Sequence, residues 1–207
     1  QDWLQLWQFN LAWLSPQDSS FFLSQTLPIA EFSSDLCGLT ATSCIPQTGT
    51  SGQLDVLREV IMWRLSYRRF SNYDVLVGNM VTNVDPVGTP APPNPAGVRW
   101  FELRQYGPIR GLNDWVVHQQ GTWAPDDSHR WMASIAMDGT GNIALAYNVS
   151  DQFGTFPGLR YSGQAFDAPS GALSEPEHVI VDGTAANAGF RYGDYASMRI
   201  DPTDDCT

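Results

Sequence analysis

The feature that most constrains the fold of this chain is a repeat of roughly 65 residues whose units begin alike. Three segments mark these beginnings, Trp63–Ser66, Trp131–Ser134 and Asp194–Ser197, and their serines lie 68 and then 63 residues apart. Most of the sequence alternates between apolar and polar side chains in short segments separated by Gly, Pro, Asn and Asp clusters. Such alternation between turn signals is typical of β-strands, and a repeated group of four strands is typical of a β-propeller blade.

The expected strands fall into groups that follow the repeat. They are 4–13 and 23–32; 62–70, 73–83, 98–106 and 114–123; 131–137, 142–150, 158–166 and 177–183; and 195–201. We therefore predict a single all-β domain over 1–207, a partial β-propeller of four-stranded antiparallel blades. Its expected parts are the outer strands of one blade with a Cys37/Cys44 loop (1–54), two complete blades (55–125 and 126–185) and the inner strand of a further blade (186–207).

A propeller closes with at least four blades, so this chain is expected to be part of a larger one or to close by association. The absence of an initiator Met before Gln1 also suggests a processed or excised piece. Incomplete blades leave unpaired strand edges, which favour self-association. The alternative fold is a β-sandwich of eight or nine strands.

Charge excludes some classes of partner. The net charge is −11, and all eleven basic residues are arginine. Electrostatic binding to nucleic acid is therefore not expected. A membrane span is not expected either, because the apolar runs are far shorter than the roughly 20 residues that a spanning helix needs.

The three cysteines bear on the compartment. Cys37 and Cys44 are close enough in sequence to close a small loop by a disulfide, with free thiols as the alternative. A disulfide indicates an oxidising compartment, so we expect a secreted or cell-surface protein. Cys206 is then unpaired or bonded to sequence outside 1–207.

Arginines precede or enter each expected inner strand, and inner strands line the central channel of a propeller. A ring of guanidinium groups there can hold a carboxylate or sulfate by bidentate hydrogen bonds. The candidate ligand-binding residues are Arg64, Arg130, Arg191 and the junction residue His129, with Arg58 near the same strand start. The alternative is that these arginines tie the structure together, Arg130 with Asp126 or Asp127 and Arg191 with Asp194.

Two acidic turns are candidates for binding calcium, the only cofactor that the sequence suggests. Calcium prefers carboxylate and carbonyl oxygens, although a full calcium-binding loop pattern is missing and ordinary turns explain both segments. The candidate ligands are Asp138, Asn142, Asp201, Asp204 and Asp205.

No convincing catalytic set is found. A glycosidase needs two carboxylates facing each other across a cleft. Asp194, with Arg130 and Arg191, is the best candidate, whereas Glu102 and Glu177 are expected to face solvent from outer strands. His118, His129 and His178 match no nucleophile triad or zinc motif.

Eight tryptophans are present, of which Trp3, Trp7 and Trp13 lie near one N-terminal strand. They can form an exposed stripe that stacks on sugars or drives self-association. The alternative is packing against a neighbour outside the sequence.

Several segments carry a resemblance to a known group of proteins. HRWMASIAMDGTGNIALAYNVSD, PGLRYSGQAF and FRYGDYASMRIDPTDDCT resemble the C-terminal propeller-like region of large secreted bacterial proteins that are often described as sialidase-like. LDVLREVIMWRLSYRRF, VRWFELRQYG and QQGTWAPDDSHRWM follow the same order, so the resemblance covers nearly the whole chain. It implies an extracellular bacterial β-propeller, in which DDCT usually continues into an aromatic-rich strand, and it implies no role for any residue.

These observations favour a secreted, non-enzymatic propeller module that binds protein or glycan or takes part in extracellular assembly. One alternative is a fragment of a sialidase-like glycosidase. The other is a structural subunit whose open blade edges build a filament or an oligomer.

Overall fold

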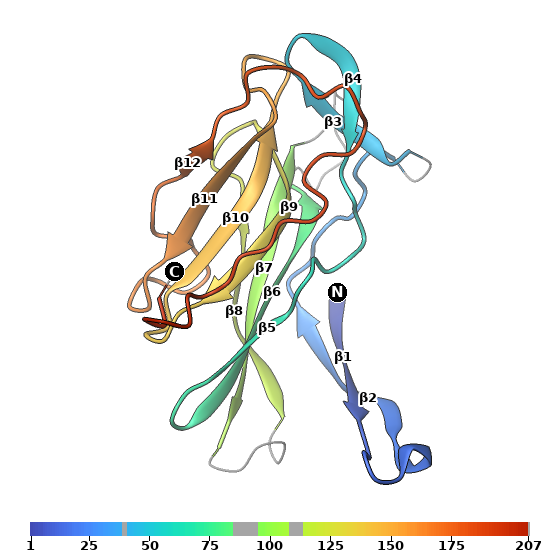
Figure 1. The fold of residues 1–207 in the computed structure, drawn as a ribbon, viewed down its shortest axis with the longest axis vertical. Helices are drawn as coiled ribbons and strands as arrows, with labels where there is room; N and C mark the ends of the chain where they lie inside the picture. Colours follow the sequence, from blue (N-terminus) through green and yellow to red (C-terminus); the bar gives the residue numbers. More distant parts are fainter. Residues whose placement is uncertain (39–40, 85–94, 108–113, 207) are drawn as a thin grey trace.

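The computed structural model describes residues 1–38, 41–84, 95–107 and 114–206 (Figure 1). Within these ranges the chain is all-β, as predicted, and its helical content is one short 3-10 turn at Pro16–Asp18. The proline-rich segment 85–95, whose composition predicts a surface loop, falls almost entirely outside the described residues.

Two antiparallel sheets of four strands form the body, and each follows chain order. The first contains β5 (Ser66–Arg69), β6 (Tyr73–Asn83), β7 (Ala96–Tyr106) and β8 (Trp115–Trp123). The second contains β9 (His129–Met137), β10 (Ile143–Ser150), β11 (Gly158–Gln164) and β12 (His178–Val181). Each sheet lies within one of the two ranges expected to hold a complete blade.

Two hairpins complete the strands. One pairs β1 (Asp2–Asn10) with β2 (Ser20–Ile29), and the other pairs β3 (Ser43–Gln47) with β4 (Thr50–Asp55). The second hairpin was not predicted, because its Gly, Thr and Ser content resembles a loop. Its tight turn depends on Gly49, whose φ of 79° suits glycine.

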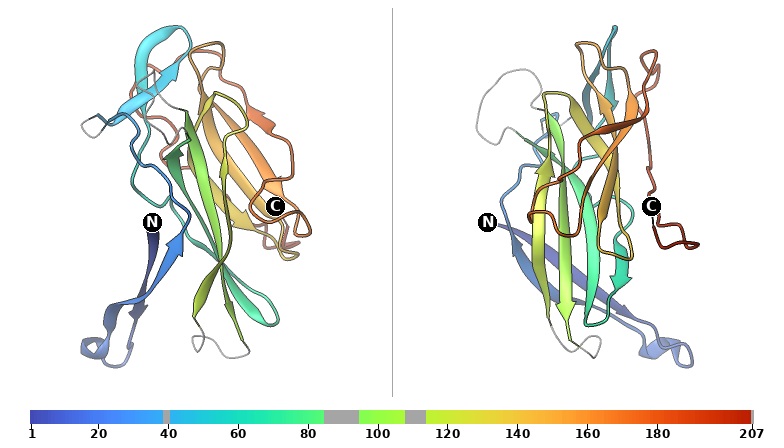
Figure 2. Two further views of the ribbon diagram at one scale, coloured as in Figure 1. Left: turned by 180° about the vertical axis from the view of Figure 1, so that it is seen from behind. Right: turned by 90° about the vertical axis from the view of Figure 1, so that its left-hand side faces the viewer.

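The elements pack as successive layers (Figure 2). The base of the β1–β2 hairpin packs on one face of the first sheet, where Leu4 and Leu27 meet Phe101 and Leu103. The other face of that sheet packs on the second sheet through a core that includes Trp100, Ile135, Leu145 and Tyr147. Stacked antiparallel sheets of this kind occur both in a partial propeller and in a sandwich.

The expected inner strand at 195–201 is not formed. This segment pairs with no strand in the described chain and is joined only to Cys206 by an isolated bridge at Asp201. Its Met198 N–H donates instead to the side-chain oxygen of Ser134, at 2.8 Å. The segment lies along the second sheet as a single irregular chain (Figure 1). Side-chain contacts hold it there in place of a ladder of backbone hydrogen bonds.

The repeat is nevertheless visible in space. Ser66 Oγ donates to the carbonyl of Ile135 at 3.0 Å, and the aligned Ser134 Oγ accepts from the aligned Met198. The turns that follow also match, since Thr140 N–H donates to Asp138 Oδ1 and Thr203 N–H donates to Asp201 Oδ1. The C-terminal chain therefore lies against β9 much as β9 lies against β5.

Candidate functional site

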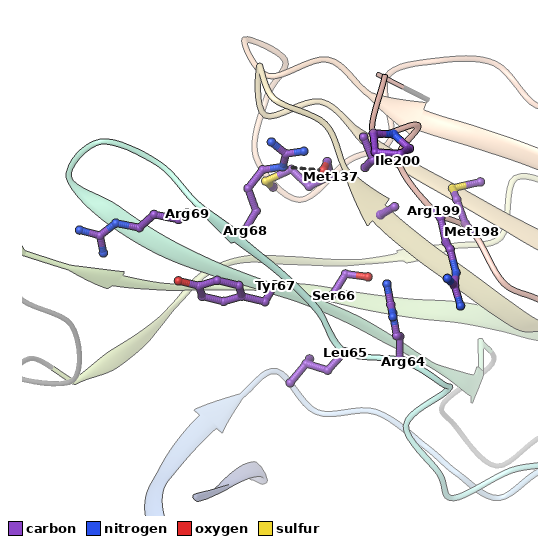
Figure 3. A pocket seen from close by; sticks show the side chains of 12 residues that line it. Arg64, Leu65, Ser66, Tyr67, Arg68, Arg69, Met137, Met198, Arg199 and Ile200 are labelled. Atoms are coloured by element: carbon purple, nitrogen blue, oxygen red, sulfur yellow. Dashed lines mark hydrogen bonds between the residues drawn. The ribbon is translucent and has the colours of Figure 1, made fainter. Parts of the chain in front are cut away.

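A groove of about 750 Å³ runs between β5, the end of β9 and the C-terminal chain (Figure 3). Its β5 wall is the unbroken run 64–69, and its other wall comes from 136–137 and 198–202. The lining residues are Arg64, Leu65, Ser66, Tyr67, Arg68, Arg69, Ala136, Met137, Met198, Arg199, Ile200 and Pro202. Segments more than a hundred residues apart in the sequence thus form one site.

Two of the four groove arginines are already neutralised. Arg68 binds both carboxylate oxygens of Asp205 and also donates to the carbonyl of Met137 at 2.9 Å. The hydrogen bonds that Arg68 donates to Asp205 raise the pKa of Arg68, and the same bonds lower the pKa of Asp205. Arg69 is paired with Asp74 at 2.7 Å.

The other two, Arg64 and Arg199, are exposed and make no hydrogen bond or ion pair with any described residue. Figure 3 shows their side chains extending toward the same part of the groove from opposite walls, near Ser66. Two positive charges thus line one groove, and neither is paired with a carboxylate of the described chain. This arrangement suits an anionic group that accepts hydrogen bonds from both guanidinium groups.

Only Arg64 of the predicted ligand-binding set lines this groove. Arg130 was predicted as a binding or catalytic residue, but it is fully buried and its guanidinium is saturated. It donates to Glu177, Asp126 and the carbonyl of Ser128 at 2.7–3.1 Å. The pKa of Asp126 falls to about 2, chiefly because of the hydrogen bonds from Arg130. Arg130 is therefore a structural tie, the alternative that its neighbours in sequence suggested.

Arg191 and Asp194 are also paired with each other, and Arg191 reaches Asp55 at 3.3 Å as well. The structure thus places Arg191 and Asp194 in one ion pair outside the groove, while Arg130 lies in a different buried network. The three candidate glycosidase residues, Arg130, Arg191 and Asp194, are each bound to partners within the chain. Arg58 donates to the carbonyls of Leu36 and Ala41 and so holds the disulfide loop.

The expectation that Glu102 and Glu177 face solvent was wrong. Glu102 is fully buried and accepts hydrogen bonds from Arg104 and from Gln119. Glu177 accepts from Arg130, from Arg160 at 2.7 Å and from Tyr147 at 2.7 Å. Both carboxylates lie on strand faces or loops that pack against other elements, which the alternation of a single strand does not reveal.

His129 is likewise internal. Its Nδ1 accepts the backbone N–H of Ala96 at 3.2 Å, and burial lowers its pKa to about 4. Because the ring is buried and already hydrogen-bonded, it does not suit the ligand-binding role predicted for it.

The calcium candidates do not fit a metal site. Asp138 Oδ1 accepts the N–H groups of Thr140, Gly141 and Asn142, and Asn142 donates its side-chain amide to Asp138. In the second turn, Asp201 accepts from Thr203, Asp204 accepts from Cys206, and Asp205 binds Arg68. Among the described residues no cluster of three or more His, Cys, Asp or Glu side chains can hold a metal ion. These residues close turns.

Cys37 and Cys44 form the predicted disulfide. In the described chain, no helix is both long and apolar enough to span a membrane.

The sequence had pointed to arginines that precede strands and had missed Arg68, Arg69 and Arg199. Their positions in the repeat could have indicated them. Arg68 and Arg69 lie at the end of the expected strand 62–70, and Arg199 lies five residues after the start of the third repeat unit at Asp194.

Comparisons with protein families, with curated proteins and with solved structures found no match for this chain. The resemblance to sialidase-like propeller regions therefore stays a prediction.

Proposed function

We propose that this chain is a non-enzymatic, extracellular β-propeller module that binds an acidic group of a protein or glycan in the arginine groove. The observation that carries the proposal is the pair Arg64 and Arg199, exposed and without an acidic partner in the described chain, although the protein has a net charge of −11. In such an acidic protein, counter-charges are plentiful. Leaving two guanidinium groups together without one suits a ligand that supplies it.

The groove also has a suitable chemical character. Guanidinium stays charged at every physiological pH and matches the two oxygens of a carboxylate or sulfate. Leu65, Met198 and Ile200 add apolar surface beside the charges. Arg68 bound to Asp205 is an internal example of the recognition proposed for Arg64 and Arg199.

A binding role is favoured over hydrolysis by the state of the carboxylates. Asp194, Glu102 and Glu177 each accept hydrogen bonds from arginine. These three carboxylates are therefore held by partners within the chain, and none of them lines the groove. The disulfide supports an oxidising, extracellular setting.

The test is a binding titration of the chain with polyglutamate and with a polyuronate, using uncharged polymers as blanks. Replacing Arg64→Gln and Arg199→Gln together should weaken binding about tenfold or more, because each removes a charge-assisted hydrogen bond. The matched control is Arg191→Gln, an exposed arginine outside the groove, which should change little. Equal affinities for all three proteins, or no binding of either polyanion, would contradict the proposal.

A second candidate function, assembly, is favoured by the β1–β2 hairpin. Large apolar side chains are exposed along its length and at its tip, on both strands. They include Trp7, Phe9, Trp13, Leu14 and Phe21, which are 53–101% exposed. Contiguous apolar surface of this kind favours contact with another polypeptide.

A further inference from the structure

The groove follows the open edge of a strand. Among the strands that the structure describes, β5 pairs with β6 alone and is the terminal strand of its sheet. Every residue from 64 to 69 lines the groove. Successive side chains of a strand point to opposite faces, so a cavity on one face would meet only every second residue. A cavity that meets each residue in succession therefore runs along the strand edge, where the backbone groups lie.

In the described chain, no strand fills the space between this edge and the opposite wall of the groove. β9 is also a terminal strand, and it packs under β5 through Ser66 and Arg68 rather than beside it. The C-terminal chain at 198–200 forms no strand. Within the described chain the space beside β5 is thus bounded by side chains, and no strand occupies it.

We propose that the ligand of this groove is an extended acidic peptide that adds to the open edge of β5 as a further strand. This inference rests on the function proposed above and names the class of its ligand. The peptide backbone would hydrogen-bond to β5, and its acidic side chains would reach Arg64 and Arg199. This mode of recognition takes affinity from the main chain and specificity from alternate side chains.

Charge explains why the edge selects acidic peptides. Exposed strand edges pair readily with other chains, and proteins protect them with charged residues. The arginines beside β5 repel basic strands and disfavour apolar strands. An acidic strand instead neutralises the charges of these arginines. The same residues therefore protect the edge and select the partner.

An edge of backbone donors and acceptors also favours a peptide over a glycan. A peptide presents donors and acceptors at the spacing of the strand, and a saccharide does not share that spacing. Leu65, Met198 and Ile200 lie where the apolar side chains of an alternating peptide can pack.

The experiment uses four probes: a peptide of alternating valine and aspartate, the same peptide N-methylated at every second amide, its valine–asparagine counterpart, and a polyuronate. N-methylation removes the backbone donors along one edge and keeps the charge. Affinity is measured by calorimetry. Backbone amide shifts and hydrogen exchange at 65–69 are followed by NMR.

The acidic peptide should bind, protect amides of β5 and lose about tenfold or more in affinity on N-methylation, on replacement of aspartate by asparagine, or with the Arg64→Gln, Arg199→Gln variant. The Arg191→Gln control should bind like the parent chain. Equal binding of the methylated peptide, or binding of the polyuronate alone, would overturn strand addition and leave the acidic-ligand function standing. No binding of any acidic probe would overturn both.

Discussion

Arg64 and Arg130 show how one residue type in similar sequence positions takes opposite roles. Each lies at the start of a repeat unit, yet Arg64 is exposed without a partner in the described chain and Arg130 is fully buried among acceptors. The difference arises from Asp126 and Glu177, which meet at Arg130 from two separate loops. Sequence could suggest Asp126, four residues away, but Glu177 is brought there only by the fold.

His129 provides a test of burial at the residue scale. Its pKa is lowered from 6.5 to about 4, chiefly by burial. Between these values the unfolded chain binds a proton at this position and the folded chain does not, so the free energy of unfolding falls as the pH drops from 6.5 to 4. The expected loss is roughly 3 kcal/mol over that window.

The loss is measured by urea unfolding at several pH values. His129→Asn keeps an acceptor for the Ala96 N–H and should flatten this part of the profile. The exposed His178→Asn is the control for the substitution itself. A parent profile with no slope between pH 6.5 and 4 would contradict the burial argument.

At the scale of elements, short segments between turn signals predicted ten strands close to their observed positions. The turn signals mattered more than alternation for strands such as β9, whose nine residues are all buried. β3–β4 was missed, since the turn at Gly49 signals a hairpin only if the flanking residues are recognised as strands. The strand expected at 195–201 was wrong for the opposite reason. Its sequence matches β9, but a strand also needs a pairing neighbour, and pairing is not local information.

The C-terminal chain is held in place by a close approach at Gly193. Its φ is +74°, and a Cβ there would lie 2.2 Å from the buried Asn148 side chain. Gly193→Ala should therefore loosen 191–206 and cost about 1 kcal/mol or more in backbone strain alone. Limited proteolysis should cut this segment faster than in the parent chain.

The control is Gly189→Ala, four residues earlier in the sequence. A Cβ at Gly189 meets its nearest neighbour at 3.6 Å, and its φ does not require glycine. Equal proteolysis of the two variants would show that the approach at Gly193 does not hold the segment.

At the scale of the whole molecule, the layers end differently on the two sides. The outer layer at one end is the β1–β2 hairpin, in which β1 pairs with β2 alone among the described strands. The outer layer at the other end is the single C-terminal chain. Only the base of the hairpin packs on the first sheet, and a hairpin without further packing is marginally stable in water, so the exposed apolar residues toward its tip favour a covering partner.

The assembly candidate predicts that the mass of the chain in solution, measured by light scattering, rises with concentration. Phe9→Thr with Phe21→Thr should lower that mass, because these residues face each other across the hairpin and are 62% and 65% exposed. Thr keeps the preference for strands. Phe153→Thr, also exposed, is the control, and a monomeric parent chain at all concentrations would contradict the candidate.

The two walls of the arginine groove differ in how they resist pulling. β5 is held by a backbone ladder to β6, whereas 195–206 is held by side-chain contacts, such as Met198 to Ser134 and Arg68 to Asp205, and by the backbone hydrogen bond from Gly139 to Asp205. A force applied at the C-terminal end would peel this segment away before either sheet unravels. The groove would then lose one wall while the body stays folded, so the binding proposed for this groove would depend on tension at that end of the chain.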